Sequence, residues 1–389
     1  MAASGSSRRR SPWPDLPAEL LGLVLMRLPS HADRVRLPAV CRAWRSAAKA
    51  TAPPPLPWLA LPDGTFLSLP DDAVHRLPVP DDVFSGFSTG GALFLMHEDG
   101  SFSLMCSSSA ATVDLPEPRF WFSGHTMSKV VVSDHLVAVL DNSWVAVYTR
   151  GGGDLAAGAS TTCMAWTSPA HKSIADIALF QGKLYVLTRE EELHVLDAGD
   201  PHITNICCIR KTLTPSPEDH DLDHIWNGDY YGPDMHIRQD YLVVAGNQLL
   251  RVELTTIIPA TICQPWTYQF HVYEAADLSC GDGRWRDVST LMGRALSVSQ
   301  SCSESVPAAA GNQCGRTGVQ EDCIYFVSKN DTMSSDSCRN TSRENPFLDS
   351  GVYNMRDRIV SPLPLETSAA STLSTCDGMW APACLFPKT

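Results

Sequence analysis

The sequence predicts a mainly β protein with a small α-helical module at its N-terminal end, in which three short helices precede a β-propeller of about six blades. Two observations predict this fold class. Apolar residues recur at helical spacing early in the chain, and beyond a proline-rich break the pattern changes to short apolar runs that end in turn residues. We therefore expect a disordered tail over 1–11, the helical module over 12–50, a proline-rich linker over 51–56 and the propeller over 57–389.

The first helix is predicted over 17–28. Its apolar residues recur at helical spacing, which places them on one face: Leu20, Leu21, Val24, Leu25 and Leu28. Asp15 and Pro17 stand where an N-cap residue and a first-turn proline belong, and Pro29 ends the helix.

Two further short helices are predicted before Ala50. Ser30 and Asp33 resemble a capping box at the start of the second helix, and Pro38 fits the first turn of the third. One face of the third helix carries Val40, Cys41, Trp44, Ala47 and Ala48. Helices this short cannot bury their apolar surface among themselves, so we expect a partner protein to cover it. The alternative is a helical cap packed on the body of the same protein.

The body of the chain is predicted to consist of repeated β-hairpins. The stretch from Thr51 to Pro57 is too rich in proline to continue a helix. Beyond it, four segments each show a strand, a polar or glycine turn and a second strand: 91–105, 134–148, 181–196 and 239–254. A recurrence of roughly 45 to 55 residues is the spacing of four-stranded propeller blades. A large β-sandwich is the alternative, but it would not require such even recurrence.

The two ends of the body are expected to share one blade. Apolar strands near its start, 58–61 and 66–69, and the segment 380–387 at its end could pair and so hide the edges of the ring.

Composition and charge exclude several classes of function. No apolar run is long enough to span a membrane and no secretory signal is recognisable, so we expect a protein of the cytoplasm, the nucleus or both, with its thirteen cysteines reduced. The first fifty residues hold nine Lys and Arg against three Asp and Glu, a net charge of +6. The remaining residues carry a net charge of −19, and the whole chain carries −13. An acidic body argues against binding to nucleic acid.

The sequence contains no motif typical of catalysis, and we predict no catalytic residues, no metal and no cofactor. It lacks a nucleophile elbow, a phosphate-binding glycine loop and a zinc-protease helix. The segment 218–236 gathers His220, His224 and His236 with several aspartates, but its turn residues argue against the helix that would align the histidines on a metal. The aromatic residues of that segment are weak candidates for contacts with a target protein: Trp226, Tyr230 and Tyr231.

The helical module resembles the F-box family. The resemblance rests on Leu16-Pro17, Glu19–Leu21, Leu25–Pro29, Ala32-Asp33 and Val40–Arg45. It implies docking on a Skp-type adaptor and, through that adaptor, on a cullin. The residues that would contact the adaptor on this resemblance are Leu16, Pro17, Leu20, Leu21, Leu25, Leu28, Val40, Cys41 and Trp44.

The body resembles the plant domain of unknown function 295, a KIB-type family of kelch-like propellers that follow F-boxes. The matching segments occur in the order of that family: 57–61, 90–105, 182–188, 240–252, 270–277, 285–298, 321–327 and 351–364. The segment Ser299 to Gln320 departs from the family because it is rich in serine, alanine and glycine.

Together the two resemblances imply a substrate-recognition subunit of a Skp-cullin-F-box (cullin-RING) E3 ubiquitin ligase. The F-box would dock on the adaptor and the propeller would bind an unknown target protein, with no bond chemistry in the chain itself. One alternative is a protein-binding propeller outside any ligase, with a divergent F-box. A propeller enzyme is the weakest alternative, because it would require a pocket with convergent carboxylates or a metal.

Overall fold

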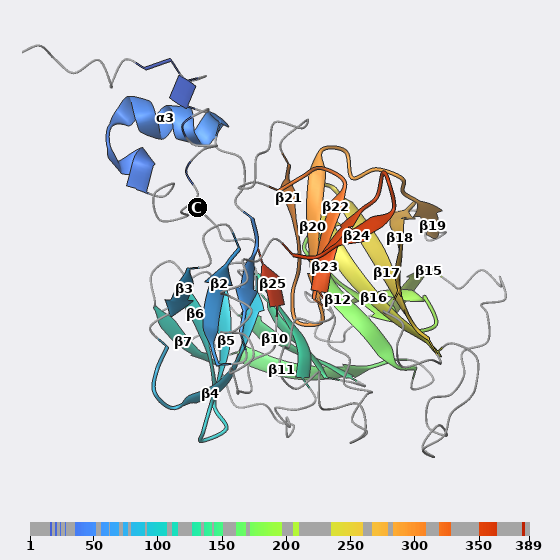
Figure 1. Ribbon diagram of the computed structural model, residues 1–389. Helices are drawn as coiled ribbons and strands as arrows, with labels where there is room; N and C mark the ends of the chain where they lie inside the picture. Colours follow the sequence, from blue (N-terminus) through green and yellow to red (C-terminus); the bar gives the residue numbers. More distant parts are fainter. Residues whose placement is uncertain are drawn as a thin grey trace, which may run out of the picture.

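The fold is a short helical module followed by six β-sheets arranged as a propeller (Figure 1). The computed structural model describes residues 16–17, 20–21, 24, 28, 36–51, 56–61, 63–69, 73–76, 79–89, 92–106, 111–115, 127–133, 136–141, 144–150, 161–168, 172–196, 205–209, 235–259, 267–278, 283–308, 319–327, 350–363 and 383–385. The predicted fold class, with about six blades, is confirmed, and the sandwich alternative is wrong.

The helical module contains a 3-10 helix, η2 (Leu37–Ala39), and an α-helix, α3 (Arg42–Thr51). Within the predicted first helix, Leu20, Leu21 and Val24 are helical, and the Leu21 N–H donates to the Pro17 carbonyl at 3.1 Å. The prediction for Pro38 is wrong in its detail. Pro38 lies in η2 rather than in the first turn of the third helix, and α3 begins only at Arg42.

Three of the sheets come from the first half of the body, with β25 added from its end. The closing blade has the order β25 (Ala383–Leu385), β1 (Trp58–Ala60), β2 (Thr65–Ser68), β3 (Val74–Arg76). The next blade is β4 (Val83–Thr89), β5 (Ala92–His97), β6 (Phe102–Cys106), β7 (Thr112–Leu115). It is followed by β8 (Met127–Val132), β9 (Leu136–Asp141), β10 (Trp144–Arg150), β11 (Thr161–Thr167).

The second half of the body forms the other three sheets. One blade is β12 (Ile174–Phe180), β13 (Lys183–Thr188), β14 (Leu193–Leu196), β15 (Asn205–Ile209). The next is β16 (Met235–Ala245), β17 (Gln248–Ile258), β18 (Thr267–Ala276), β19 (Arg284–Asp287). The last has five strands in the order β21 (Ser303–Pro307), β20 (Arg294–Ser299), β22 (Cys323–Val327), β23 (Ser350–Asn354), β24 (Ile359–Ser361).

The inner strands of the blades face the centre of the ring. Strands β4, β8, β12, β16 and β21 contact one another in that order, and β21 contacts β25. Each of the four predicted hairpins is present, as the strand pairs β5–β6, β9–β10, β13–β14 and β16–β17. The β12–β13 turn, which precedes the third of these hairpins, is also tight: Gln181 and Gly182 both have positive φ, 50° and 76°, which is the conformation of a two-residue turn that matches strand twist.

The β20–β24 blade departs from the other five. Strands β20 and β22 are parallel, whereas the other pairs of neighbouring strands in the six sheets are antiparallel. The reason is that β21, formed by Ser303–Pro307, folds back beside β20 and takes the inner position. We did not expect a strand in the serine-rich segment that begins at Ser299.

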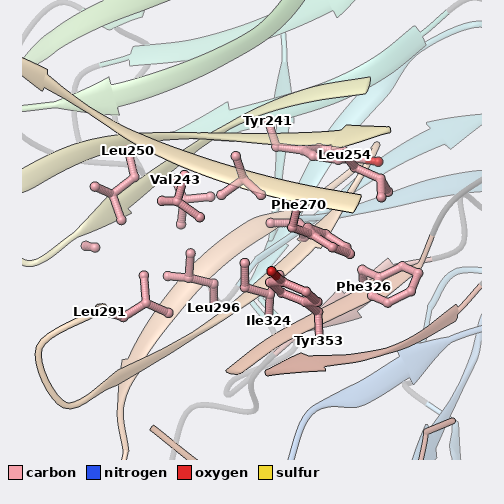
Figure 2. Packing of buried hydrophobic residues seen from close by; sticks show 14 residues of the cluster. Tyr241, Val243, Leu250, Leu254, Phe270, Leu291, Leu296, Ile324, Phe326 and Tyr353 are labelled. Atoms are coloured by element: carbon pink, nitrogen blue, oxygen red, sulfur yellow. The ribbon is translucent and has the colours of Figure 1, made fainter. Parts of the chain in front are cut away.

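The core consists of apolar layers between neighbouring blades. Figure 2 shows the layer between the β16–β19 blade and the β20–β24 blade, in which Phe270, Phe326 and Tyr353 lie against one another. The Phe270 ring stacks on Tyr353 with centroids 4.6 Å apart and meets Phe326 edge-on at 5.1 Å. Buried aromatic pairs of this geometry stabilise by about 0.5–1.5 kcal/mol beyond their buried area.

The centre of the ring contains a buried ion pair that joins four blades. Lys129 Nζ on β8 donates to Asp176 Oδ2 on β12 at 2.7 Å, to Ser303 Oγ on β21 at 3.1 Å and to the Leu242 carbonyl on β16 at 3.4 Å. Asp176 also accepts the N–H groups of Leu242 at 2.6 Å and Ile177 at 2.7 Å. Burial raises the pKa of Asp176, and Lys129 opposes that rise. The pair therefore holds the inner strands together at a point that is almost fully buried.

The structure confirms that the chain ends close the ring. Strand β25 pairs with β1 in antiparallel register, with Trp58 opposite Leu385 and Ala60 opposite Ala383. Deleting residues 379–389 should therefore expose the inner edge of β1, lower the melting temperature and cause aggregation. Light scattering after gel filtration and a thermal melt would measure both effects, with deletion of 387–389 as the control. A truncated protein that stayed monomeric with an unchanged melting temperature would contradict the pairing.

Replacing Lys129 tests the central ion pair. Lys129→Met leaves the Asp176 carboxylate buried without its cation and should lower the free energy of unfolding by about 3–5 kcal/mol. Adding Asp176→Asn should restore part of the loss, because the amide oxygen still accepts the Leu242 N–H without a charge. Denaturant titration measures the three proteins, and Lys183→Met, an exposed lysine on β13, is the control. A loss below about 1 kcal/mol, as is typical of an exposed salt bridge, would contradict the role given to this buried pair.

Candidate functional site

The helical module has a small core of its own. Leu21 and Leu37 are buried, and Leu16, Leu28 and Trp44 pack against them. No residue of the β-sheets belongs to this cluster as far as the described residues define it. The helical cap buried on the body, which the sequence left as an alternative, is therefore not what the described residues show.

Three apolar side chains of the module face outward. Leu20 is 48% exposed, Val24 37% and Val40 64%. Leu20 and Val24 are four positions apart and so lie on the same side of their helix, next to but distinct from the side that buries Leu21. The module thus divides its apolar residues into an inner set that holds the helices together and an outer set that its own fold leaves uncovered.

The remaining residues expected at the adaptor are placed as follows. Pro17 is exposed, and Cys41 is half-buried with its Sγ accepting the Trp44 N–H at 3.5 Å. Leu25 lies outside the described residues, as do the candidate target contacts Trp226, Tyr230 and Tyr231. The assignment of these residues to an adaptor or a target stays a prediction.

A second feature is a network of five charged side chains between the β12–β15 and β16–β19 blades. Arg251, which is 2% exposed, donates to Asp240 and Glu253 at 2.7 Å each and lies 3.4 Å from Glu191. Arg238 lies 2.8 Å from Glu191, 3.0 Å from Asp240 and 3.4 Å from Glu253. Every charge in the network therefore faces an opposite charge, as burial at this depth requires.

Aromatic rings and a backbone bond fix this network in place. The Arg251 guanidinium lies over the rings of Tyr273 at 5.2 Å and Trp285 at 5.6 Å. Trp285 in turn donates from Nε1 to the Glu191 carbonyl at 3.0 Å, which ties the β13–β14 turn to the next blade. Burial raises the pKa of the Glu191 carboxyl, but Arg251 and Arg238 together outweigh it and hold that pKa below its ordinary value.

A polar recess of about 80 Å³ lies beside the network, where the inner strands β12 and β16 begin. It is lined by Asp176 of β12, Arg189 of the β13–β14 turn, Gln300 of the β20–β21 turn and part of β16, from Arg238 to Tyr241. The recess therefore draws its walls from three blades. The Tyr241 hydroxyl donates to Gln239 Oε1 at 3.2 Å, and burial, with Asp176 and Asp240 nearby, raises the pKa of Tyr241 above its ordinary value.

The recess lies at one end of the ring, and the helical module joins the ring at the other end. Strand β1 occupies the second position of its blade, as β13 and β17 do in theirs. The start of β1, where the module joins, thus lies at the end of the ring that carries the β12–β13 and β16–β17 turns. Arg189 follows β13 and lines the recess at the other end.

An Asp-His-Ser arrangement occurs in the β4–β7 blade and was not predicted. His97 Nδ1 donates to Asp82 Oδ2 at 2.9 Å, and the Ser103 hydroxyl donates to Nε2 at 2.8 Å. In a hydrolase the aspartate is buried and the serine faces the substrate. Here Ser103 is 1% exposed whereas the Asp82 side chain is 59% exposed, so the arrangement is the opposite. With its hydroxyl inside the blade, Ser103 serves to join β6 to the end of β5.

Metal and membrane features are absent from the described part of the chain. Its His, Cys, Asp and Glu side chains form no group of three that could hold a metal ion. Its helices are too short or too polar to cross a bilayer.

Sequence reasoning found the module but missed the charged network and the recess. Their residues are far apart in the chain, for example Asp176 and Gln300, and come together only when the ring closes. The one signal available was the pair of charges within β17, Arg251 and Glu253, at strand positions that otherwise alternate with buried leucine and valine.

Comparisons with known proteins match both parts of the chain. The KIB1-4 beta-propeller family matches residues 66–354, and the F-box-like family matches residues 13–52. The F-box protein SKIP23 of Arabidopsis thaliana is 41% identical over 63 residues, which are 16% of this chain and 16% of that protein. The matched region thus spans about a sixth of the length of that relative.

Solved structures show more distant similarity. A protein from Lactobacillus plantarum is 10% identical, with a TM-score of 0.36, over 85% of this chain and 99% of that one. A structural genomics protein of unknown function from Bacteroides thetaiotaomicron is 12% identical, with a TM-score of 0.32, over 60% of this chain and 50% of that one. With the family match covering most of the body and the six sheets closing as a ring, the chain belongs to the KIB1-4 beta-propeller family and carries its propeller behind an F-box-like module, as a plant F-box protein does.

Proposed function

We propose that this chain is the substrate-recognition subunit of a Skp-cullin-F-box (cullin-RING) E3 ubiquitin ligase. Its helical module, 12–50, docks on a Skp-type adaptor and thereby on a cullin, and its propeller, 57–389, binds the protein to be ubiquitylated. The linker 51–56 joins the two. The chain performs no bond chemistry in this proposal, because its contribution is to hold the target near the ligase-bound ubiquitin.

The single observation that carries this proposal is the outward-facing apolar set of the module. Leu20, Val24 and Val40 lie on a module whose inner residues already form a core without them. Full burial of an exposed Leu or Val contributes about 1.5–3 kcal/mol, and these three side chains, which are 37–64% exposed, would each contribute roughly half of that on docking. Leu21, by contrast, contributes by holding the helices in shape.

Charge supports the same partner. Residues 12–50 hold six Lys and Arg against three Asp and Glu, a net charge of +3, whereas residues 51–389 carry −19, so the module is basic although the whole chain is acidic. An acidic adaptor surface would be attracted to the module and repelled by the body, which favours docking in one orientation.

The target and the place of action belong to the proposal as well. Trp226, Tyr230 and Tyr231, in the sequence between β15 and β16, are candidate target contacts because aromatic residues supply much of the energy at protein interfaces. A ligase subunit of this kind would act in the cytoplasm, the nucleus or both.

Substituting the outward-facing residues tests adaptor docking. Leu20→Asp with Val40→Asp should reduce recovery of a Skp-type adaptor by at least about tenfold, because each buries a charge in the expected interface. The melting temperature should stay unchanged, since both side chains are exposed in the free chain. Co-purification from cells that express both proteins measures recovery.

Val74→Asp is the matched control, because Val74 is 50% exposed but lies on the outer strand β3 of the closing blade. It should leave adaptor recovery unchanged. Undiminished recovery by the double variant would remove the proposed interface. If the unaltered chain itself recovered no adaptor, the alternative of a protein-binding propeller outside any ligase would replace the proposal.

A further inference from the structure

The polar recess contains hydrogen-bond donors without partners. Of its four charged residues, three are neutralised: Asp176 by Lys129, Asp240 by Arg251 and Arg238 by the carboxylates around it. Arg189 is exposed and forms no ion pair with any residue that the structure describes. Among the charged residues that line the recess, it is therefore the one without an ion-pair partner in the described part of the chain.

Backbone bonds hold Arg189 in position at the mouth of the recess. Its N–H donates to the Ser173 carbonyl at 3.0 Å, and the turn that carries it is closed by two bonds between Thr188 and Glu191 or Glu192, at 3.0 and 2.9 Å. The Trp285 bond to Glu191 anchors the same turn from the neighbouring blade. The backbone from which the Arg189 side chain extends is thus fixed, so binding has to order the side chain but not the turn that carries it.

Gln300 is presented across the recess in the same way. The β20–β21 turn is fixed by Ser299, whose N–H and hydroxyl both donate to the Cys302 carbonyl, at 2.8 and 2.9 Å. The Gln300 side chain is exposed and makes no hydrogen bond within the described residues. Its amide adds a neutral donor to the charged donor of Arg189.

We infer that this recess is a subsite for an acidic side chain, aspartate or glutamate, of the target protein. Arg189 supplies a bidentate charged donor of the geometry that a carboxylate accepts, and Gln300 can donate a further bond. The volume of about 80 Å³ fits one short side chain and excludes a nucleotide or other large cofactor. The inference deepens the proposed function, on which it rests, by giving one feature of the target's chemistry.

The position of the recess agrees with this role. It opens at the end of the ring opposite to the one where the helical module joins, so a bound adaptor would not cover it. The floor beneath it is the central Lys129–Asp176 pair, which is held by four blades and cannot shift without breaking the ring contacts.

A peptide library tests the inference without knowledge of the target. The purified full chain is applied to sets of short immobilised peptides, each set with one fixed central residue and mixed residues elsewhere. We expect peptides with central Asp or Glu to bind about tenfold more strongly than those with Asn or Gln, as a charge-assisted bond implies. Arg189→Gln should abolish this preference, and Arg189→Glu should reverse it toward Lys and Arg.

Arg76→Gln is the matched control, because Arg76 is an exposed arginine on the outer strand β3. It should keep the preference for acidic peptides. The absence of any preference, or a preference that survives Arg189→Glu, would overturn the inference.

Adaptor recovery separates this inference from the proposed function. Arg189→Glu should recover a Skp-type adaptor as well as the unaltered chain does, because the two surfaces are at opposite ends of the ring. If the adaptor never binds but the acidic preference is present and depends on Arg189, the ligase role fails and the subsite remains. If the adaptor binds and the preference is absent, the reverse holds.

Discussion

The Lys129–Asp176 ion pair is the constraint on which the geometry of the ring depends. One lysine on β8 contacts β12, β16 and β21 at the same point, so four blades share a single buried charge and its partners. A buried ion pair adds little net stability compared with an apolar pair, but breaking it is costly because a charge is left uncompensated. Its effect is therefore on specificity: it disfavours arrangements in which any of these inner strands is displaced.

The charged network between the β12–β15 and β16–β19 blades extends the same principle outward. Apolar contacts alone would allow neighbouring sheets to slide, because burial of apolar area has no preferred direction. The Arg251 guanidinium has two carboxylates at 2.7 Å and lies over two aromatic rings. A shift of one sheet against the other would break these directional contacts. The polar recess is thus lined in part by side chains that are already fixed, whereas the side chains of Arg189 and Gln300 are exposed.

Sequence pattern predicted the blades well and their edges poorly. The recurrent hairpins were recognisable because middle strands such as β9 and β13 are buried on both faces and read as continuous apolar runs. The outer strands β3, β19 and β24 are short and mostly exposed, so nothing in their composition marks them as strands. They exist because a neighbouring strand offers unpaired backbone groups, and that is a property of the assembled sheet rather than of the segment.

The candidate site could be predicted only in part for the same reason, because the division of its residues depends on the assembled structure. Helical spacing placed Leu20, Leu21 and Val24 within one apolar stripe, but it could not say which part of the stripe the module uses for itself. The structure separates the two parts of the stripe, because Leu21 is buried with Leu37 whereas Leu20 and Val24 are left exposed. Among its described residues the module has a small core, and a module of this kind gains stability when a partner binds its folded form. On the proposed function, docking on an adaptor would therefore add stability to the helices. The propeller is held by its own apolar layers between blades and by the ion pair at its centre.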